Sequence, residues 1–562
     1  MTFTYMVSAT DWGRIAPLLV LVGMALVIML VDVLLPQSNP RSKNSGPANF
    51  VVLPVLAFVG ALGALAATII LFIIGDHQPA FNQMISSDTG ALYADLILVS
   101  ALGLAVLFSP AFLKRLQIAQ QGEYYALMLL ATVGMMLLAA AASFLLVFLG
   151  IEMLSLALYI LCGFIAQRKS SQEAGMKYFL LSSFASGFLL YGIALAYGAT
   201  GSTTFATIHS FLATHHTPLP TLLLIAMGLL SVGFAFKVSA VPFQAWTPDV
   251  YQGAPAPVTA FMSVGTKAAA FIAFARVFDV VLGPIQSYWM PVIWAIAILT
   301  IVGGNIMALV QSNVKRMLAY SGIAHAGYLL IGIVVGGSVG IAALLFYLLS
   351  YVFLNVGAFG TVSLLERLDN SGMDNADLRG LWYRRPALAG FLAFFLLALA
   401  GFPPMAGFAA KYYLFYAALI GGHPELLIIG VLASVLGMYY YLRIIASMFM
   451  ERAVVSEGGE IGPIQTVPAV PATPSHSAAR RSTGGLSSAA GTAVAVKPKS
   501  TTSVPKSPAR VAAAVAPQEQ QGLVWISWTG IVIAALGTLA MGTVLPFWLV
   551  NLAQQAATMM LK

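Results

Sequence analysis

The stretch SVGFAFKVSAVPFQAWTPDVYQGAPAPVTAFMSVGTKAAA, residues 231–270, decides the fold. It contains two apolar segments with one lysine each, Lys237 and Lys267, separated by a segment that prolines such as Pro242 and Pro255 interrupt. A charged side chain at the centre of a bilayer costs about 2.5–3.5 kcal/mol on insertion scales, and proline removes a backbone donor from a helix. Such breaks occur at membrane depth only where protein or a water-filled cavity surrounds them. The stretch therefore predicts a path for ions or protons.

The composition is that of a polytopic membrane protein. Of the 562 residues, 60% are hydrophobic and 8% are charged, whereas soluble domains are about 45–50% apolar and about 25% charged. Apolar runs of about 20 residues recur, and no stretch alternates as a membrane β-barrel strand would. We expect an all-α polytopic membrane protein with about 14 transmembrane helices, of which helix 7 (219–252) and helix 12 (386–421) are broken.

The order of the spans predicts two five-helix repeats, because each broken helix is the fourth of five. Broken helices at matching places in two halves indicate an inverted-repeat transporter. We expect the segments to be helices 1–3 (1–121), a first repeat of helices 4–8 (122–281), a second repeat of helices 9–13 (282–450), a disordered linker (451–521) and helix 14 (522–562). The linker is rich in Pro, Ala, Ser, Thr and Gly and cannot bury enough apolar surface to fold. It is either a tolerated insertion, which we favour, or a binding arm.

Basic residues follow the odd-numbered spans and are absent from loops such as 75–90. This distribution predicts how the chain is oriented in the membrane. They are Arg41 and Lys43, Lys114 and Arg115, Arg168 and Lys169, Lys315 and Arg316, Arg367 to Arg385, and Arg452 to Arg510. Lys and Arg are retained on the cytoplasmic side. We therefore expect a multi-pass membrane protein with both termini outside and the linker in the cytoplasm. The net charge of +8 then reflects orientation against the lipid bilayer, and we expect no nucleic-acid partner.

No cofactor, metal or nucleotide site is expected on this chain. The single cysteine, Cys162, cannot form an internal disulfide, and iron–sulfur clusters usually need four thiolates. We find neither a dinucleotide fingerprint nor a P-loop motif. Redox or ATP chemistry that drives this protein would lie on another chain.

Titratable residues inside the apolar spans are the candidate site. Intramembrane acids and bases are functional hypotheses by default. Glu152 is either the acidic partner of a lysine or a neutral group that packs two helices, and Lys237, Lys267 and Lys411 lie deep beside the broken helices. A buried lysine can release a proton near neutral pH because desolvation disfavours its charged form. These residues predict a proton path.

Two further titratable residues leave alternatives open. Lys177 lies nearer the cytoplasmic end of its span, where it either snorkels to the headgroups or takes part in proton transfer. His325 is a single histidine among small residues, and alone it would more often be a satisfied core histidine. In line with the lysines it becomes a plausible relay group, because histidine binds and releases protons near neutral pH.

The sequence resembles the antiporter-like subunits of respiratory complex I, the proton-pumping NADH:quinone oxidoreductase. The segment PFQAWTPDVYQGAPAPVTAFMSVGTKAAAF (242–271) is similar to the helix 7–8 signature of that family, and its P-D-V-Y-Q-G-A-P wording resembles the bacterial subunit N branch. Supporting similarities are FLGIEMLSLALYIL (148–161), MKYFLLSSFASG (176–187), VKRMLAYSGIAHAGYLL (314–330) and GFPPMAGFAAKYYLF (401–415). Gln244 stands where many relatives have histidine, and glutamine cannot titrate.

This resemblance implies a fourteen-helix antiporter-like fold and proton translocation coupled to quinone reduction in other subunits. It implies that Glu152 and Lys237 are the family's glutamate–lysine pair, Lys267 its central lysine and Lys411 the lysine of the second broken helix. Lys177 and His325 lie in matching motifs as relay residues. The implied partners are other membrane-arm subunits and protons, with NADH, FMN, iron–sulfur clusters and quinone held on those other subunits.

Two other functions compete with this one. The first is a redox-independent, multi-subunit cation/proton antiporter, and the second is a structural membrane subunit whose lysines only hold helices together. The P-D-V-Y-Q-G-A-P motif favours complex I over the antiporter, because it resembles the complex I subunits. The series of intramembrane titratable residues argues against a purely structural role.

Overall fold

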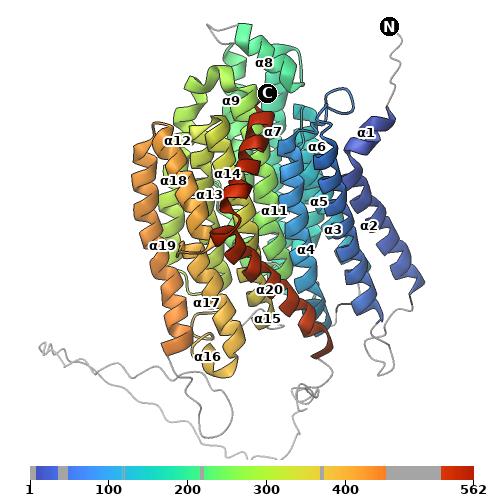
Figure 1. Ribbon diagram of the computed structural model, residues 1–562, viewed down its shortest axis with the longest axis vertical. Coiled ribbons are helices and arrows are strands. Elements are labelled where there is room, and N and C mark those ends of the chain that lie inside the picture. The colour runs from blue at the N-terminus through green and yellow to red at the C-terminus, as the bar shows by residue number, and fades with distance from the viewer. Residues whose placement is uncertain are drawn as a thin grey trace, which may run out of the picture. The chain divides into compact units, whose positions relative to one another are not determined.

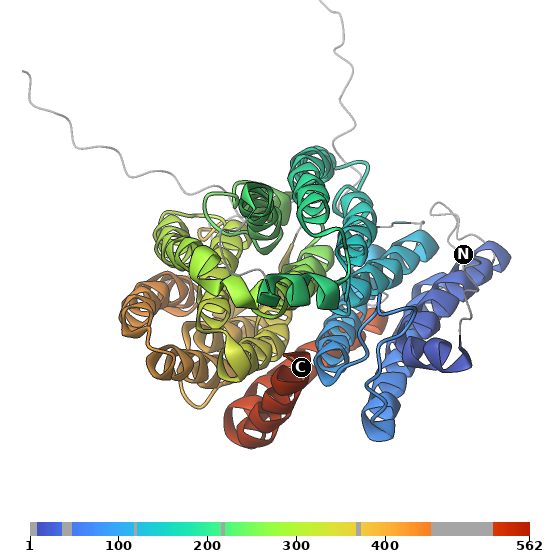
Figure 2. The same cartoon turned by 90° about the horizontal axis from the view of Figure 1, so that it is seen from above.

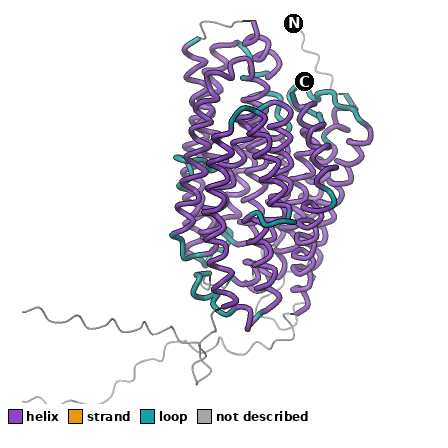
Figure 3. Tube along the Cα trace, turned by 60° about the vertical axis from the view of Figure 1, so that its left-hand side comes forward, coloured by secondary structure: helices purple, strands orange, loops and turns teal. Residues whose placement is uncertain are grey.

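The computed structural model describes residues 8–35, 48–116, 118, 121–214, 220–366, 373–450 and 521–561. In these ranges the chain is helical, and isolated β-bridges such as Ser143–Thr204 occur without any strand (Figure 1, Figure 3). The linker expected at 451–521 lies outside the described residues, except that Gln521 begins a helix. The basic residues Arg41 and Lys43 also lie outside them.

The helices follow the expected spans closely, with a few short additions. They are α1 (Ala9–Arg14), α2 (Ala16–Leu34), α3 (Ala48–Ile74), α4 (Thr89–Arg115), α5 (Gln121–Ala139), α6 (Phe144–Cys162), α7 (Lys169–Thr200), α8 (Phe205–Thr214), α9 (Thr221–Val238), α10 (Trp246–Gly253), α11 (Ala256–Ala275) with the π-helical turn η1 (Arg276–Val281), the 3-10 turn η2 (Gly283–Ile285), α12 (Gln286–Leu309), α13 (Val314–Val335), α14 (Gly337–Tyr351), the π-helical turn η3 (Val352–Val356), α15 (Gly357–Leu365), α16 (Leu381–Arg384), α17 (Pro386–Ala400), α18 (Ala406–Ile420), α19 (Pro424–Met450), α20 (Gln521–Thr543) and α21 (Pro546–Met560).

The expected helical membrane fold is confirmed. Thirteen helical segments of the described residues are long and apolar enough to span a membrane. The remaining expected span, helix 12, is divided into α17 and α18, of 15 residues each. Its break contains Gly401 at φ +94°, a backbone conformation that glycine adopts without steric cost. Helix 7 is likewise divided, since α9 ends at Val238 and α10 begins at Trp246.

The C-terminal span differs from the expectation of one helix over 523–550. Helix α20 ends at Thr543, and a separate helix, α21, begins at Pro546. Proline has no backbone N–H to continue the helical ladder, and it is well suited to the first turn of a new helix. Helix α21 packs against α14 and α4, and Gln554 Nε2 donates a hydrogen bond to the Tyr413 hydroxyl at 3.0 Å. The short helices α1, α8 and α16 were not expected from the apolar pattern.

Figure 2 shows the helices of the bundle from above, and neighbouring helices pack in pairs in both halves of the chain. Helix α5 packs on α6 and α12 on α13, and similarly α7 packs on α9 and α14 on α18. Small residues allow the closest approaches: a Cβ on Gly134 would lie 2.5 Å from the Leu154 backbone nitrogen, and one on Gly304 would lie 2.6 Å from the Ala324 backbone nitrogen. Close backbone contact at small residues is how membrane helices associate without a hydrophobic driving force between them.

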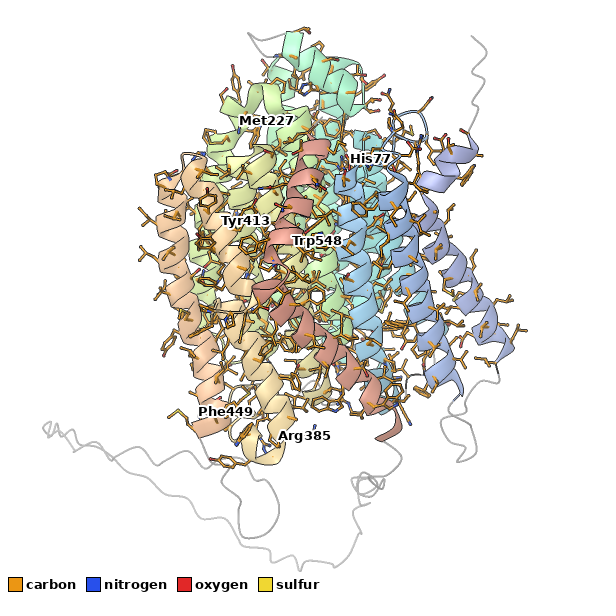
Figure 4. The ribbon with its side chains drawn as sticks, in the orientation of Figure 1. His77, Met227, Arg385, Tyr413, Phe449 and Trp548 are labelled. Carbon is orange, nitrogen blue, oxygen red and sulfur yellow. The ribbon has the colours of Figure 1, made fainter. Side chains whose placement is uncertain are left out.

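Helices α11 and α13 lie in the interior and are buried over almost their whole length. The outer helices expose large apolar side chains, such as Leu26 of α2 and Ile73 of α3, as expected of surfaces that face lipid. Figure 4 places His77 and Met227 towards one end of the bundle and Arg385 and Phe449 at the other. The bundle thus surrounds two inner helices, and these carry Lys267 and His325.

Candidate functional site

Lys237 is held by two hydroxyl groups in the last turn of α9. Its Nζ donates to Ser155 Oγ of α6 at 2.7 Å and to Ser182 Oγ of α7 at 2.6 Å. The side chain is almost fully enclosed, with 4% of the residue exposed. Helix α9 ends one residue later, where Ser239 adopts φ +65° at the start of the break. A buried ammonium satisfied by neutral acceptors is bound without a fixed counter-charge.

Glu152 lies one helical turn before Ser155 on α6, which places both side chains on one face of that helix. It is within electrostatic range of Lys237, but no ion pair joins the two residues among the described contacts. Glu152 Oε1 is buried and has no hydrogen-bond partner there. The expected glutamate–lysine pair is therefore a pair without direct contact, and Ser155, one turn after Glu152, hydrogen-bonds the lysine.

Lys267 lies at the centre of α11 and is fully buried. Its Nζ donates to the backbone carbonyl oxygen of Gly322, on α13, at 2.6 Å. The ammonium also faces the ring of Tyr251, 6.0 Å from the ring centroid. The Tyr351 hydroxyl is buried beside Gly322, next to the position that a Cβ would take, and it has no hydrogen-bond partner among the described residues. Lys267 thus bridges the two inner helices of the bundle.

His325 lies one turn after Gly322 and contacts two tyrosine hydroxyls. Its Nδ1 is 2.7 Å from the Tyr347 hydroxyl, and its Nε2 is 3.4 Å from the Tyr441 hydroxyl. The Tyr441 hydroxyl in turn hydrogen-bonds Ser321. The imidazole is within electrostatic range of both Lys267 and Lys411. Each ring nitrogen therefore faces a hydroxyl that can both donate and accept a proton.

Lys411, on α18, lies beside the second break. Its Nζ donates to the Ala400 carbonyl oxygen at 3.1 Å, at the end of α17. The ammonium lies 5.3 Å from the centroid of the Tyr328 ring, within the range of a cation–π contact. Proline-rich residues after Gly401 leave this carbonyl without a helical donor, and the lysine supplies one.

One face of α13 connects the residues just described. Gly322, His325 and Tyr328 recur at intervals of three residues, so each is the neighbour of the next on the surface of the helix. Gly322 accepts from Lys267, His325 lies between the two lysines, and the Tyr328 ring faces Lys411. The structure therefore brings Lys267, His325 and Lys411 together along α13. No hydrogen bond among the described residues joins this row to the Lys237 group.

Lys177 is not part of the buried row. Its side chain is 42% exposed, and it forms ion pairs with Glu173 at 2.8 Å and with Asp249 at 2.9 Å. Asp249 also accepts from Arg316 at 2.6 Å. The role of Lys177 in proton transfer stays a prediction, and its position is that of a half-exposed residue in a surface ion-pair group. Gln244 Oε1 is buried without a partner among the described residues.

A buried charged group at the junction of α10 and α11 was not predicted as a site. Glu366 follows α15, and its Oε1 accepts from Arg168 at 2.6 Å and from Lys315 at 3.2 Å. The side chains of Glu366 and Lys315 are fully buried. The sequence pattern indicated only loop cations, because burial of these loops depends on how the helices meet. We call Arg168, Lys315 and Glu366 the junction cluster.

A second buried ion pair lies at the other end of α11. Arg276, in η1, pairs with Asp88 at 2.6 Å and donates from Nε to the Ala139 carbonyl oxygen at 2.7 Å. Asp88 also caps α4 through the Ala91 backbone nitrogen. Burial raises the pKa of the Asp88 carboxyl, but the Arg276 guanidinium and these hydrogen bonds hold it below its ordinary value. The helix that carries Lys267 is thus fixed near both ends by buried charges.

The residues described do not form a metal centre. No group of three or more His, Cys, Asp or Glu side chains gathers within the described ranges in a way that could hold a metal ion. Cys162, the only cysteine of the chain, is buried against Met262. The absence of a cofactor from this chain stays a prediction.

Comparison with known proteins identifies the family. Residues 141–437 match the family described as NADH:quinone oxidoreductase/Mrp antiporter, TM. The chain is 44% identical over 437 residues to NADH-quinone oxidoreductase subunit N of Trichlorobacter lovleyi, covering 78% of this chain and 87% of that protein. The chain belongs to the subunit N family of NADH-quinone oxidoreductases. Another member, subunit N 2 of Roseiflexus castenholzii, is 42% identical over 453 residues, or 79% of this chain and 88% of that one.

Solved structures share the fold of this subunit N family member. A chain of respiratory complex I from Thermus thermophilus with bound aureothin is 29% identical, with a TM-score of 0.66 over 95% of this chain and 98% of that one. A chain of the Mrp complex from Dietzia sp. is 19% identical, with a TM-score of 0.71 over 98% of each, and its likeness concerns the fold alone. The antiporter-like fold expected from the sequence is confirmed.

Proposed function

We propose that this chain is a membrane-arm subunit of NADH:quinone oxidoreductase that translocates protons through a buried relay. The relay consists of Glu152, Lys237, Lys267, His325 and Lys411, and Lys177 is a peripheral member on the uptake side. Relatives at 40–44% identity bear the name NADH-quinone oxidoreductase subunit N, which supports the assignment to that enzyme. The chain itself supplies the proton path, and other subunits supply the redox chemistry.

The observation that carries this proposal is the row of contacts along α13. Lys267 donates to Gly322, His325 faces the tyrosine hydroxyls, and Lys411 lies over Tyr328. Each of these groups is buried. A charged side chain at the centre of a bilayer costs about 2.5–3.5 kcal/mol on insertion scales, so such residues indicate a functional role. A helix that places titratable side chains and hydroxyls at every turn is suited to pass a proton along its length.

The proposed switch is the distance between Glu152 and Lys237. Opposite charges stabilise each other, and the effect grows as the local dielectric constant falls. Because Lys237 is bound by Ser155 and Ser182 rather than by Glu152, a change in the charge or position of Glu152 alters the proton affinity of Lys237 without breaking a direct bond. Water in the helix break after Ser239 would connect this group to Lys267.

We further propose where the chain acts and what surrounds it. NADH, FMN, iron–sulfur clusters and quinone would be held by other subunits, and the partners would be neighbouring membrane-arm subunits and the lipid bilayer. The location would be a bacterial inner membrane. Both termini would face outward, because Arg385, one of the basic residues expected in the cytoplasm, lies at the opposite end of the bundle from α1 and the end of α21 (Figure 1, Figure 4).

The test is NADH-driven proton uptake in sealed vesicles containing the assembled enzyme. We compare Glu152→Gln, Lys237→Ala, Lys267→Ala and Lys411→Ala with Lys169→Ala, a control in which an exposed lysine at the start of α7 is removed. We expect uptake to fall at least fivefold in each relay variant and to stay within 1.5-fold in the control. Normal uptake in all four relay variants would leave only the structural role.

A redox-independent cation/proton antiporter is the second candidate. The matched family is described jointly as NADH:quinone oxidoreductase and Mrp antiporter, and the Mrp complex from Dietzia sp. has the same fold. The two functions differ in what drives proton movement. Proton uptake that needs NADH and quinone supports the first, whereas exchange driven by an imposed sodium gradient, without NADH, supports the second.

A further inference from the structure

The junction cluster forms hydrogen bonds to the backbone on both sides of the joint between α10 and α11, residues 254–256. Lys315 Nζ donates to the Ala254 carbonyl oxygen at 2.7 Å, where α10 ends. Glu366 Oε2 accepts from the Ala256 backbone nitrogen at 3.2 Å, where α11 begins. The residue between these two contacts is Pro255, which has no N–H to donate. Two side chains from the second half of the chain therefore satisfy the backbone of a joint in the first half.

The two oxygens of Glu366 have separate tasks. One is neutralised by Arg168 and Lys315, and the other meets the first turn of α11. A carboxylate is favourable at a helix N-terminus because the free N–H groups there carry partial positive charge. The side chain of Glu366 is fully buried, so water does not compensate for its loss. Removing its charge would leave two cations, Arg168 and Lys315, facing the positive end of α11.

Helix α13 connects the junction cluster to Lys267. Lys315 and Gly322 are both on α13, seven residues or about 10.5 Å apart along the helix axis. Lys315 binds the carbonyl oxygen at the end of α10, two residues before α11 begins, and Gly322 accepts from Lys267 farther along α13. Because the helix is stiff on this scale, the two contacts fix the register of α11 against α13. A shift of the joint would change the distance from Lys267 to its acceptor.

We propose that Glu366 is a positioning residue for Lys267, acting through the α10–α11 joint as a clamp between the two halves of the chain. This inference rests on the proposed role of Lys267 in proton translocation. In the absence of the clamp, α11 would still be anchored at its far end by the Arg276–Asp88 pair. The expected consequence is therefore a loosened joint and a misplaced lysine, rather than loss of the whole helix.

The test uses Glu366→Gln and Glu366→Asp in the assembled complex, with Asp377→Asn as the control for loss of an exposed acid near the same end of the bundle. Hydrogen exchange of the segment 254–267 is measured by mass spectrometry, and proton uptake is measured per assembled complex. We expect Glu366→Gln to speed exchange in this segment at least threefold and to lower uptake at least threefold. Glu366→Asp should lie between Glu366→Gln and the parent, and the control should match the parent.

A double variant separates positioning from general damage. If Glu366 acts through Lys267, Glu366→Gln combined with Lys267→Ala should lower uptake no further than Lys267→Ala alone. Multiplied losses in the double variant, or unchanged exchange at 254–267 in Glu366→Gln, would overturn the inference. If Glu366→Gln does not assemble, the same two measurements on Glu366→Asp decide. Normal uptake in Lys267→Ala would instead refute the proposed function. The rate of hydrogen exchange at 254–267 in Glu366→Gln would still test the clamp in that case.

Discussion

Lys267 donates a hydrogen bond to the backbone carbonyl oxygen of Gly322, 2.6 Å away, and so ties the centre of α11 to α13. A glycine at this position leaves room for the ammonium. A Cβ there would lie 3.1 Å from Lys267 Nζ and 3.2 Å from the Tyr351 hydroxyl. The contact therefore depends on the glycine at position 322, which has no side chain, as well as on the lysine.

Gly322→Ala should impair proton uptake although it removes no titratable group. The methyl group would displace the ammonium by a few tenths of an ångström, so we expect uptake to fall twofold to fivefold while the amount of assembled enzyme stays near that of the parent. Gly187→Ala is the control, because a Cβ at Gly187 would meet nothing within 4 Å. Equal uptake in the two variants would show that the Lys267–Gly322 contact is not needed.

Lys411→Ala should reduce proton uptake much more than Lys177→Ala. Lys411 is buried against Tyr328, whereas Lys177 is half-exposed and its ion pairs are of a kind that contributes only about 0.2–1 kcal/mol. We expect at least a fivefold loss for the first variant and less than a twofold loss for the second, measured per assembled enzyme. A loss for Lys177→Ala as large as that for Lys411→Ala would place Lys177 in the main path.

Gly304→Ala should destabilise the packing of α12 on α13, and its neighbour provides the control. A Cβ on Gly304 would lie 2.6 Å from the Ala324 backbone nitrogen, whereas one on Gly303 would meet only Val241 Cγ2, at 3.4 Å. Overpacking of this kind costs about 1–3 kcal/mol. We expect a lower unfolding temperature and less assembled enzyme for Gly304→Ala. Gly303→Ala should remain near the parent, and identical melting curves would contradict the packing described.

The Asp88–Arg276 pair should make the stability of the fold depend on pH in the acid range. Burial raises the pKa of Asp88, but Arg276 and the hydrogen bonds hold it below its ordinary value, so the pair stabilises the fold fully above about pH 4, the unfolded pKa. This stabilisation is lost as the pH falls through the lower pKa of the folded state. Asp88→Asn leaves Arg276 buried without its partner and should cost about 3–5 kcal/mol at neutral pH.

The measurement for this pair is the unfolding temperature of the purified protein between pH 7 and pH 3. The parent should lose stability at the acid end, and Asp88→Asn should be less stable at pH 7 and less sensitive to acid. Asp76→Asn is the control, since Asp76 pairs with Arg14 at a partly exposed site, where ion pairs contribute about 0.2–1 kcal/mol. An acid response in Asp88→Asn as steep as in the parent would assign the effect to other groups.

Much of the fold follows from hydropathy, because the bilayer requires apolar runs of fixed length. The breaks after Val238 and Ala400 were also predictable, since proline and glycine interrupt these runs. The end of α20 was missed, because Leu545 continues the apolar pattern into Pro546 and α21. The short helices α8 and α16 connect spans and carry no signal of membrane length.

The site was predictable as a set of residues and not as a geometry. Intramembrane lysines are conspicuous because each is costly, and this identified Lys237, Lys267 and Lys411. Their actual partners, such as Ser155 and the Gly322 carbonyl oxygen, are common in apolar helices and give no signal. Which of them faces a lysine depends on the rotation of packed helices, which one sequence does not specify.

The sequence did not predict the burial of the junction cluster, and it left open whether Lys177 reaches the surface. Charges at span ends are usually exposed, so Lys315 was counted only as a loop residue and Glu366 was not considered, although both side chains are fully buried. Lys177 lies inside an apolar span and yet reaches two carboxylates at the surface. Long side chains near the end of a span can extend several ångströms from their backbone position.

The most direct test of the proposed relay is proton uptake by the assembled enzyme carrying Lys267→Arg. Arginine keeps the positive charge and the hydrogen-bond donor, but it does not release a proton in proteins because its pKa exceeds about 12. NADH-driven uptake is measured in sealed vesicles beside Lys169→Arg as the control. If Lys267 passes protons, uptake should fall at least fivefold in Lys267→Arg and stay unchanged in the control. Normal uptake in Lys267→Arg would contradict a relay through this lysine.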